Sequence, residues 1–101
     1  MAFDRGTLDT HLSAAAGEDP ALIAELRAAF VESAERQLDL LGRSRCDANW
    51  RFAAERLRGL AASFEVVDLI TLADEAGQGA PGDPYIQRKI REALKLLTNE
   101  A

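Results

Sequence analysis

The sequence predicts an all-α protein, an antiparallel four-helix bundle preceded by one short helix. Three observations support this prediction. Apolar residues recur every three or four positions along four long segments, and no stretch shows the alternation of a β-strand. The prolines and most of the glycines fall between these segments, where helices end or begin. The composition, 48% hydrophobic and 29% charged over 101 residues, suits one globular domain covering residues 1–101.

The first predicted helix is short and covers about residues 7–16. Thr7 can cap its start, and Gly17 ends it. Three residues form its apolar side: Leu8, Leu12 and Ala15. Residues 1–6, which precede this helix, are expected to form a flexible N-terminus.

The second predicted helix is the longest. Asp19 followed by Pro20 is a capping residue followed by a first-turn proline, which is typical of a helix start. The helix is expected to end near Gly42. Its apolar residues recur at intervals of three or four positions: Leu22, Leu26, Phe30, Ala34, Leu38 and Leu41. This spacing predicts an amphipathic helix with one buried side.

Two further apolar sets follow along the chain. Asp47 can cap the third helix, whose apolar residues are spaced like the seam of an antiparallel bundle: Trp50, Ala53, Leu57, Leu60 and Phe64. The next set comprises Val66, Leu69, Ile70, Leu72, Ala73 and Ala76. The phase of the pattern shifts between the two sets, which predicts a bend or break at residues 63–67.

The last helix follows the only long loop signal, GQGAPGDP at residues 77–84. Asp83 and Pro84 repeat the combination of a capping residue and a first-turn proline. The apolar side of this helix carries Ile86, Ile90, Leu94 and Leu97. Four long helices with one apolar stripe each can bury those stripes only against one another, which predicts the bundle.

The composition excludes several classes of function. Twelve Lys and Arg against 17 Asp and Glu give a net charge of −5, which disfavours nucleic acid and anionic membranes as partners. A single Cys and a single His rule out a multi-cysteine or histidine-rich metal site, and no motif for a cofactor is present. No signal peptide or membrane-spanning run is visible. We therefore expect a cytoplasmic protein without a metal or cofactor.

The exposed face of the third helix carries the candidate functional residues. With the apolar seam facing the core, six residues point outward: Arg51, Phe52, Glu55, Arg58, Gly59 and Ala62. Gly59 costs about 1 kcal/mol relative to alanine in a helix interior, and Phe52 places an aromatic ring at the surface. These residues could form a docking surface. Alternatively, Gly59 admits a neighbouring helix, and Glu55 forms ordinary surface pairs with Arg51 and Arg58.

A family resemblance favours the docking surface. The segment AERLRGLAASFEVVDLITLADE, residues 54–75, resembles the signature of histidine-containing phosphotransfer (HPt) domains, roughly A-H-x-L-K-G-x-A followed by spaced leucines. Six residues carry the match: Leu57, Arg58, Gly59, Ala61, Leu69 and Leu72. The upstream segment LIAELRAAFVESAERQLDLL resembles the long helix that precedes the motif in this family. The resemblance spans about residues 21–97 and implies an HPt-like bundle.

The chain departs from the family at the position that matters for phosphotransfer. Glu55 stands where the family carries its phosphorylatable histidine, and a carboxylate with nothing to activate it is a poor substitute for the imidazole nucleophile. The family also usually has glycine near the end of this helix, where this chain has Glu65. The resemblance therefore implies a phosphorylation-incompetent HPt domain without catalytic residues, which is not an enzyme.

The resemblance also implies the partners. In the family, the helix that bears the histidine docks against a response-regulator receiver domain, and the six exposed residues would form the equivalent surface here. Gly59 would allow close approach, Phe52 would supply an apolar contact, and Arg58 stands at the family's basic position near the phosphoryl group. A receiver domain or a histidine kinase of a two-component phosphorelay is the expected partner. The protein would act as an adaptor or an inhibitor.

Two other hypotheses remain open from the sequence. The protein could transfer phosphate through His11 or another acceptor, although His11 lies on the short first helix and is far along the chain from Glu55. It could instead be a structural bundle that forms a weak homodimer through Phe52, Gly59 and Ala62. Cys46 has no second cysteine to pair with and is interpreted as an incidental thiol.

Overall fold

A computed structural model describes residues 5–98, and these residues form five helices and no strand. The helices are α1 (Arg5–Ala16), α2 (Pro20–Arg43), α3 (Asp47–Ser63), α4 (Val67–Gln78) and α5 (Pro84–Thr98). The prediction of an all-α bundle is confirmed, whereas the first helix has 12 residues, as many as α4, and is not distinguished by its length. The flexible N-terminus predicted for residues 1–6 lies mostly outside the described residues, and its last two residues belong to α1.

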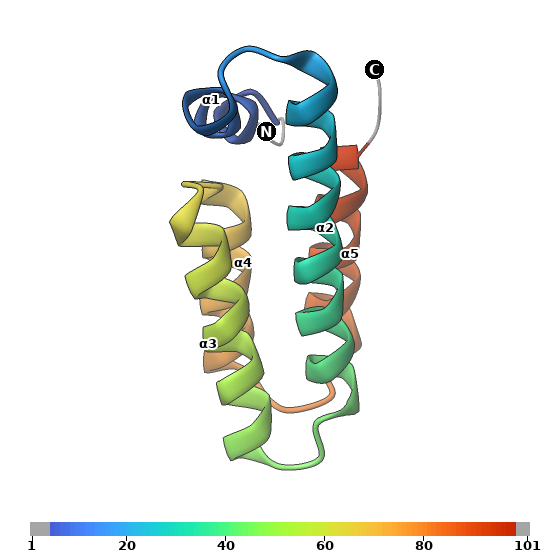
Figure 1. Ribbon diagram of the computed structural model, residues 1–101. Helices are drawn as coiled ribbons and strands as arrows, with labels where there is room; N and C mark the ends of the chain where they lie inside the picture. The colour runs from blue at the N-terminus through green and yellow to red at the C-terminus, as the bar shows by residue number, and fades with distance from the viewer. Residues whose placement is uncertain (1–4, 99–101) are drawn as a thin grey trace.

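Helices α2 to α5 form a ring in which the chain runs up and down in turn (Figure 1). Each of these helices packs against the next one in sequence, and α5 returns to pack against α2. Helix α1 lies across one end of the bundle and packs against α2 (Figure 1). Within the described residues, the ring is therefore an antiparallel four-helix bundle with α1 covering one end.

Three helix boundaries follow the predicted signals. The Asp19 carboxylate accepts hydrogen bonds from the backbone N–H groups of Ala21 (3.1 Å) and Leu22 (3.4 Å), which caps α2 in front of Pro20. The Asp83 carboxylate accepts a bond of 2.9 Å from the N–H of residue 85 at the start of α5. Helix α1 ends before Gly17, whose φ of +70° is the left-handed conformation that glycine adopts easily.

Other predicted boundaries were wrong. Helix α1 begins at Arg5, so Thr7 lies inside its first turn and does not cap it. Cys46 is the N-cap of α3 and makes no side-chain capping bond, which leaves Asp47 as the first helical residue. Its negative charge still suits the positive end of the helix dipole. Helix α4 continues through Gln78, which shortens the predicted loop.

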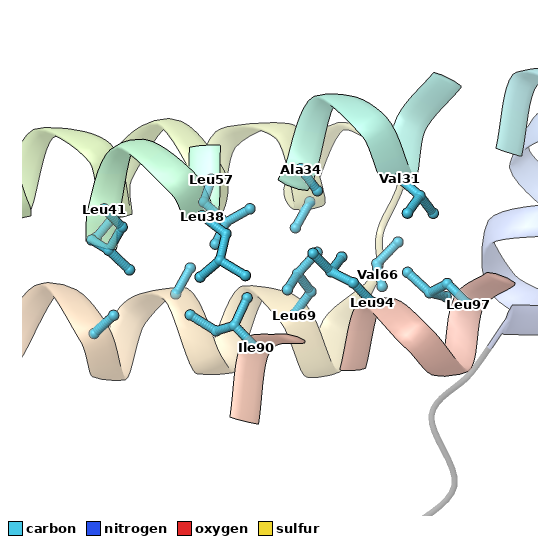
Figure 2. Packing of buried hydrophobic residues seen from close by; sticks show 14 of the residues in the cluster. Val31, Ala34, Leu38, Leu41, Leu57, Val66, Leu69, Ile90, Leu94 and Leu97 are labelled. Carbon is cyan, nitrogen blue, oxygen red and sulfur yellow. The ribbon is translucent and has the colours of Figure 1, made fainter. Parts of the chain in front are cut away.

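The core lies between the four long helices (Figure 2). Figure 2 shows Leu38 of α2, Leu57 of α3, Leu69 of α4 and Ile90 of α5 directed toward the centre of the bundle, and each is at most 5% exposed. Most of the predicted apolar stripe residues are buried or pack against this core, and the exceptions are at the ends of helices. Leu22, predicted to be buried, is 38% exposed, and Ala15 of α1 is exposed.

Three aromatic residues join the helices: Trp50, Phe30 and Phe64. The indole of Trp50 is 1% exposed, and its Nε1 donates a hydrogen bond of 2.6 Å to the carbonyl oxygen of Ala76, which joins α3 to α4. The ring of Phe30 on α2 meets the ring of Phe64 edge-on, with centroids 5.2 Å apart. An edge-on arrangement suits the charge distribution of two aromatic rings.

The predicted break between α3 and α4 is a tight turn with the hydrogen bonds of a Schellman motif. The N–H of Val66 bonds to the carbonyl oxygen of Ala61 (3.0 Å), and the N–H of Glu65 bonds to that of Ala62 (3.1 Å). Glu65 has a φ of +54° and is the only non-glycine residue among the described ones with positive φ. This turn position favours glycine, because a side chain strains the left-handed conformation.

Candidate functional site

All six residues predicted for the exposed face of α3 are exposed in the structure: Arg51, Phe52, Glu55, Arg58, Gly59 and Ala62. The buried residues of α3 occupy the opposite side of the helix: Trp50, Ala53, Ala54, Leu57 and Ala61. The separation follows from the helical repeat, because residues three, four and seven positions apart share one side. The apolar seam therefore placed the exposed face correctly.

The structure divides this face between two grooves. Four of the six residues line a groove between α3 and α4: Arg51, Glu55, Arg58 and Gly59. We call it the α3/α4 groove, and α4 contributes Asp74 to it. Phe52 lies on the other side of α3 and lines a second groove, toward α2. Ala62 lies on the exposed face beyond the lining of either groove.

The charged side chains of the α3/α4 groove do not pair as the sequence suggested. The Nε of Arg58 donates a hydrogen bond of 2.6 Å to Oδ1 of Asp74, which joins α3 to α4, and each side chain is about half exposed. Within residues 5–98, the side chain of Glu55 makes no hydrogen bond or ion pair, either with Arg51 or with Arg58. The predicted local pairs are therefore absent, and the Glu55 carboxylate faces solvent unpartnered.

Gly59 does not admit a neighbouring helix. A Cβ built on it would meet no atom within 4 Å outside its own helical surroundings. The packing explanation for this glycine is therefore wrong, and its backbone stays open to solvent in the middle of α3. An exposed glycine beside three charged side chains leaves room for another molecule to approach the helix backbone closely.

Phe52 belongs to a different part of the surface. Its side chain is 59% exposed, and the guanidinium carbon of Arg56 lies 5.6 Å from the centroid of its ring. Leu40 of α2, 43% exposed, lines the same groove. This groove, the α2/α3 groove, is separate from the α3/α4 groove and carries the larger apolar surface.

The single histidine lies outside both grooves. The Nε2 of His11 is 3.2 Å from Oε1 of Glu65, on the turn that follows α3. Glu55 lies more than two helical turns before that turn, which corresponds to roughly 12 Å along the axis of α3. Cys46 is exposed and has no disulfide partner.

Two of the groove residues that the sequence reasoning missed are Asp74 and Leu40. Asp74 has no local signal, because its partner Arg58 lies 16 positions earlier on another helix. Leu40 could have been found, because the apolar stripe of α2 uses Leu38 and Leu41, so a third leucine between them must point elsewhere.

Compared with protein-family models, with curated proteins and with solved structures, the chain matches none of them. Of the helices in the described part of the chain, none combines the length and apolar character that a bilayer span requires. The residues from 5 to 98 also contain no group of three or more His, Cys, Asp or Glu placed to hold a metal ion.

Proposed function

We propose that this protein is an HPt-like domain of a two-component phosphorelay that does not accept phosphate and acts by binding a response-regulator receiver domain. The observation that carries the proposal is the exposed, unpartnered carboxylate of Glu55, which shares the α3/α4 groove with Arg58 and the open backbone of Gly59. In the HPt resemblance, Glu55 occupies the position of the phosphorylated histidine.

The chemistry of the groove favours binding over catalysis. A carboxylate side chain is ionised at neutral pH and needs no base to act as a nucleophile, but it is a weaker nucleophile toward phosphate than the imidazole of histidine. The titratable neighbours of Glu55 in the groove are two arginines, Arg51 and Arg58, and the carboxylate of Asp74, which Arg58 engages. An acyl phosphate on the exposed Glu55 carboxylate would lie open to hydrolysis by water, so the groove suits binding better than phosphate storage.

The same residues suit recognition of another protein. Asp74 holds the Arg58 guanidinium in place, so less side-chain freedom is lost when a partner binds it. Gly59 removes the side chain that would keep a second helix away from α3. Glu55 presents a negative charge where phosphohistidine would carry one, so it either mimics the phosphorylated state or requires a divalent cation between itself and an acidic receiver pocket.

The turn after α3 gives separate support for an HPt-like path of the chain. HPt domains usually have glycine near the end of this helix. In this chain Glu65 occupies a left-handed turn position that glycine adopts without strain. The backbone requirement that would explain a glycine in the family is thus present in this chain, although the residue is glutamate. This agreement concerns the path of the chain and is independent of the residues in the groove.

Titration against receiver domains of the same cell tests the proposal. Binding would be measured by calorimetry, with and without Mg²⁺ and a phosphoryl analogue on the receiver. We expect saturable binding that Arg58→Glu abolishes. Arg88→Glu, the same charge change on an exposed residue of α5, serves as the control and should leave binding unchanged. If no receiver binds, or if the two variants behave alike, the proposal is wrong.

A second experiment addresses Glu55 itself. Glu55→His restores the residue type of the motif and should allow phosphate to be accepted from a phosphorylated receiver, detected as acid-labile label on the purified protein. The unmodified protein should acquire none. Label on the unmodified protein that is lost in His11→Ala would instead identify His11 as an acceptor.

A further inference from the structure

A second surface of the molecule lies over α2 and α3, on the side of α3 away from Asp74. Two adjoining depressions form it. One follows the outer side of α2 and is lined by Glu35, Asp39 and Arg43, among others. The other is the α2/α3 groove, and both include Leu40 and Arg43 in their lining. The surface is therefore continuous from the middle of α2 to Phe52 of α3.

The centre of this surface is apolar. Leu40 is 43% exposed and Phe52 is 59% exposed, and both line the α2/α3 groove. Leaving a leucine and a phenylalanine in water forgoes the free energy that burial would provide. Aromatic side chains of this kind are frequent anchors at the centres of protein interfaces.

Two of the charged side chains around this centre, Glu35 and Arg43, have opposite signs and lie at equal distances from Asp39. Glu35 lies four positions before Asp39, and Arg43 lies four positions after it, so each is about 6 Å from Asp39 along the axis of α2. Arg43 already pairs with Asp39 at 2.8 Å, with both side chains largely exposed. Within the described residues, Glu35 has no ion-pair partner.

We propose that this surface binds a second copy of the chain in an antiparallel, two-fold symmetric dimer. A two-fold axis perpendicular to α2 near Asp39 places Glu35 of each copy opposite Arg43 of the other. The same axis brings Leu40 and Phe52 of both copies to the centre, where they bury one another. The two Asp39 carboxylates meet near this axis, and the Arg43 of the same chain, 2.8 Å away, neutralises each of them, so the pairs between Glu35 and Arg43 form around a compensated centre.

This dimer does not depend on the proposed receiver binding. Arg58 and Asp74 lie in the α3/α4 groove, on the other side of α3 from Phe52. The dimer surface also differs from a self-association surface built on Gly59 and Ala62, because its second half is contributed by α2. Receiver titration with Arg58→Glu and mass measurement with Phe52→Glu therefore report on the two proposals separately.

Sedimentation equilibrium of the full chain over a range of concentrations tests the dimer. We expect a mass that rises from one to two copies with concentration. Phe52→Glu should weaken the dimer by about tenfold or more. Leu96→Glu is the matched control, because Leu96 is 51% exposed on α5 and should leave the association unchanged. Helix content from circular dichroism shows whether each variant folds.

A charge exchange tests the two-fold arrangement. Glu35→Arg places two arginines together at each end of the interface, and Arg43→Glu places two carboxylates there, so each single variant should weaken the dimer. The double variant restores opposite charges and should recover it. A monomer at all concentrations, an equal effect of Phe52→Glu and Leu96→Glu, or a double variant no better than the single ones would each overturn the proposal. A receiver or another protein found on this surface of a monomeric chain would overturn it as well.

Discussion

The two faces of α3 are built from alternating stretches of the same 17 residues, yet different forces determine them. Trp50 and Leu57 on the inner face are at most 1% exposed and contact the other helices, so packing restricts what can replace them. On the outer face, the Glu55 side chain makes no hydrogen bond or ion pair with the described residues, and a Cβ on Gly59 would meet no atom within 4 Å. A residue that stability disfavours, such as Gly59, is therefore informative about function mainly when it lies on the outer face.

The largest difference in stability between the two faces should appear when a side chain is truncated to alanine. Leu57→Ala removes a side chain that is 0% exposed and should lower the free energy of unfolding by about 3 kcal/mol, because it leaves a cavity in the core. Phe52→Ala removes a larger but 59% exposed side chain and should change stability by less than about 0.5 kcal/mol. Urea unfolding of both variants measures the difference. Equal losses would show that the faces are not distinct.

At Gly59, unlike Leu57, a substitution should raise the free energy of unfolding. Gly59→Ala adds a methyl group where nothing lies within 4 Å and should raise the free energy of unfolding by about 1 kcal/mol through helix propensity alone. Ala62→Gly, on the same exposed face, should lower it by a similar amount. Thermal melts of the two variants provide the comparison. A loss of stability in Gly59→Ala would mean that this glycine has a structural role after all.

At the turn after α3, the conformation of the backbone at Glu65 matters more than the face on which a side chain lies. Glu65→Gly should raise the free energy of unfolding by about 0.5 kcal/mol, because relief of the strained left-handed conformation exceeds the greater freedom of glycine in the unfolded chain. Glu65→Ala keeps the strain and loses the contact with His11, so it should not be stabilising. Denaturation of both variants distinguishes the effect of backbone strain from that of the contact with His11. A Glu65→Gly variant less stable than Glu65→Ala would contradict this account.

The smallest change in the free energy of unfolding should come from removing the ion pair between α3 and α4. Asp74→Asn should cost only a few tenths of a kcal/mol, because both Asp74 and Arg58 are about half exposed and solvent screens them. The cost should shrink further in high salt. Unfolding in low and high salt measures both quantities. A loss of several kcal/mol would place this pair among the main determinants of the fold.

Much of the fold could be predicted because apolar spacing and capping residues are local signals. Asp19, Asp83 and Gly17 marked their helix ends correctly, since each acts on backbone groups within a few positions. Leu22 was misplaced because spacing shows which side of a helix is apolar but not where the neighbouring helices stop. Helix α2 has 24 residues and α3 has 17, so the first turns of α2 extend beyond the partner that buries the rest.

The candidate site could be predicted only in part. The outer face of α3 follows from the helical repeat, so Arg51, Glu55 and Arg58 were placed together correctly. Asp74 could not be added, because no rule of spacing relates residues on two helices before their packing is known. For the same reason the sequence grouped Phe52 with Glu55 and Arg58 on one face of the third helix, whereas the structure assigns it to a separate groove beside Leu40.

The order in which the helices meet around the bundle also bears on how fast the chain folds. Each of α2, α3 and α4 packs against the helix that follows it in sequence, and α2 with α5 is the principal contact between helices distant along the chain. Proteins dominated by such local contacts close short loops at low entropic cost and fold in microseconds to milliseconds. We expect the single tryptophan, Trp50, to report folding on this timescale in rapid-mixing fluorescence, whereas a main phase lasting seconds would contradict it. We expect the packing of α5 against α2, which closes the ring, to form after the contacts between consecutive helices.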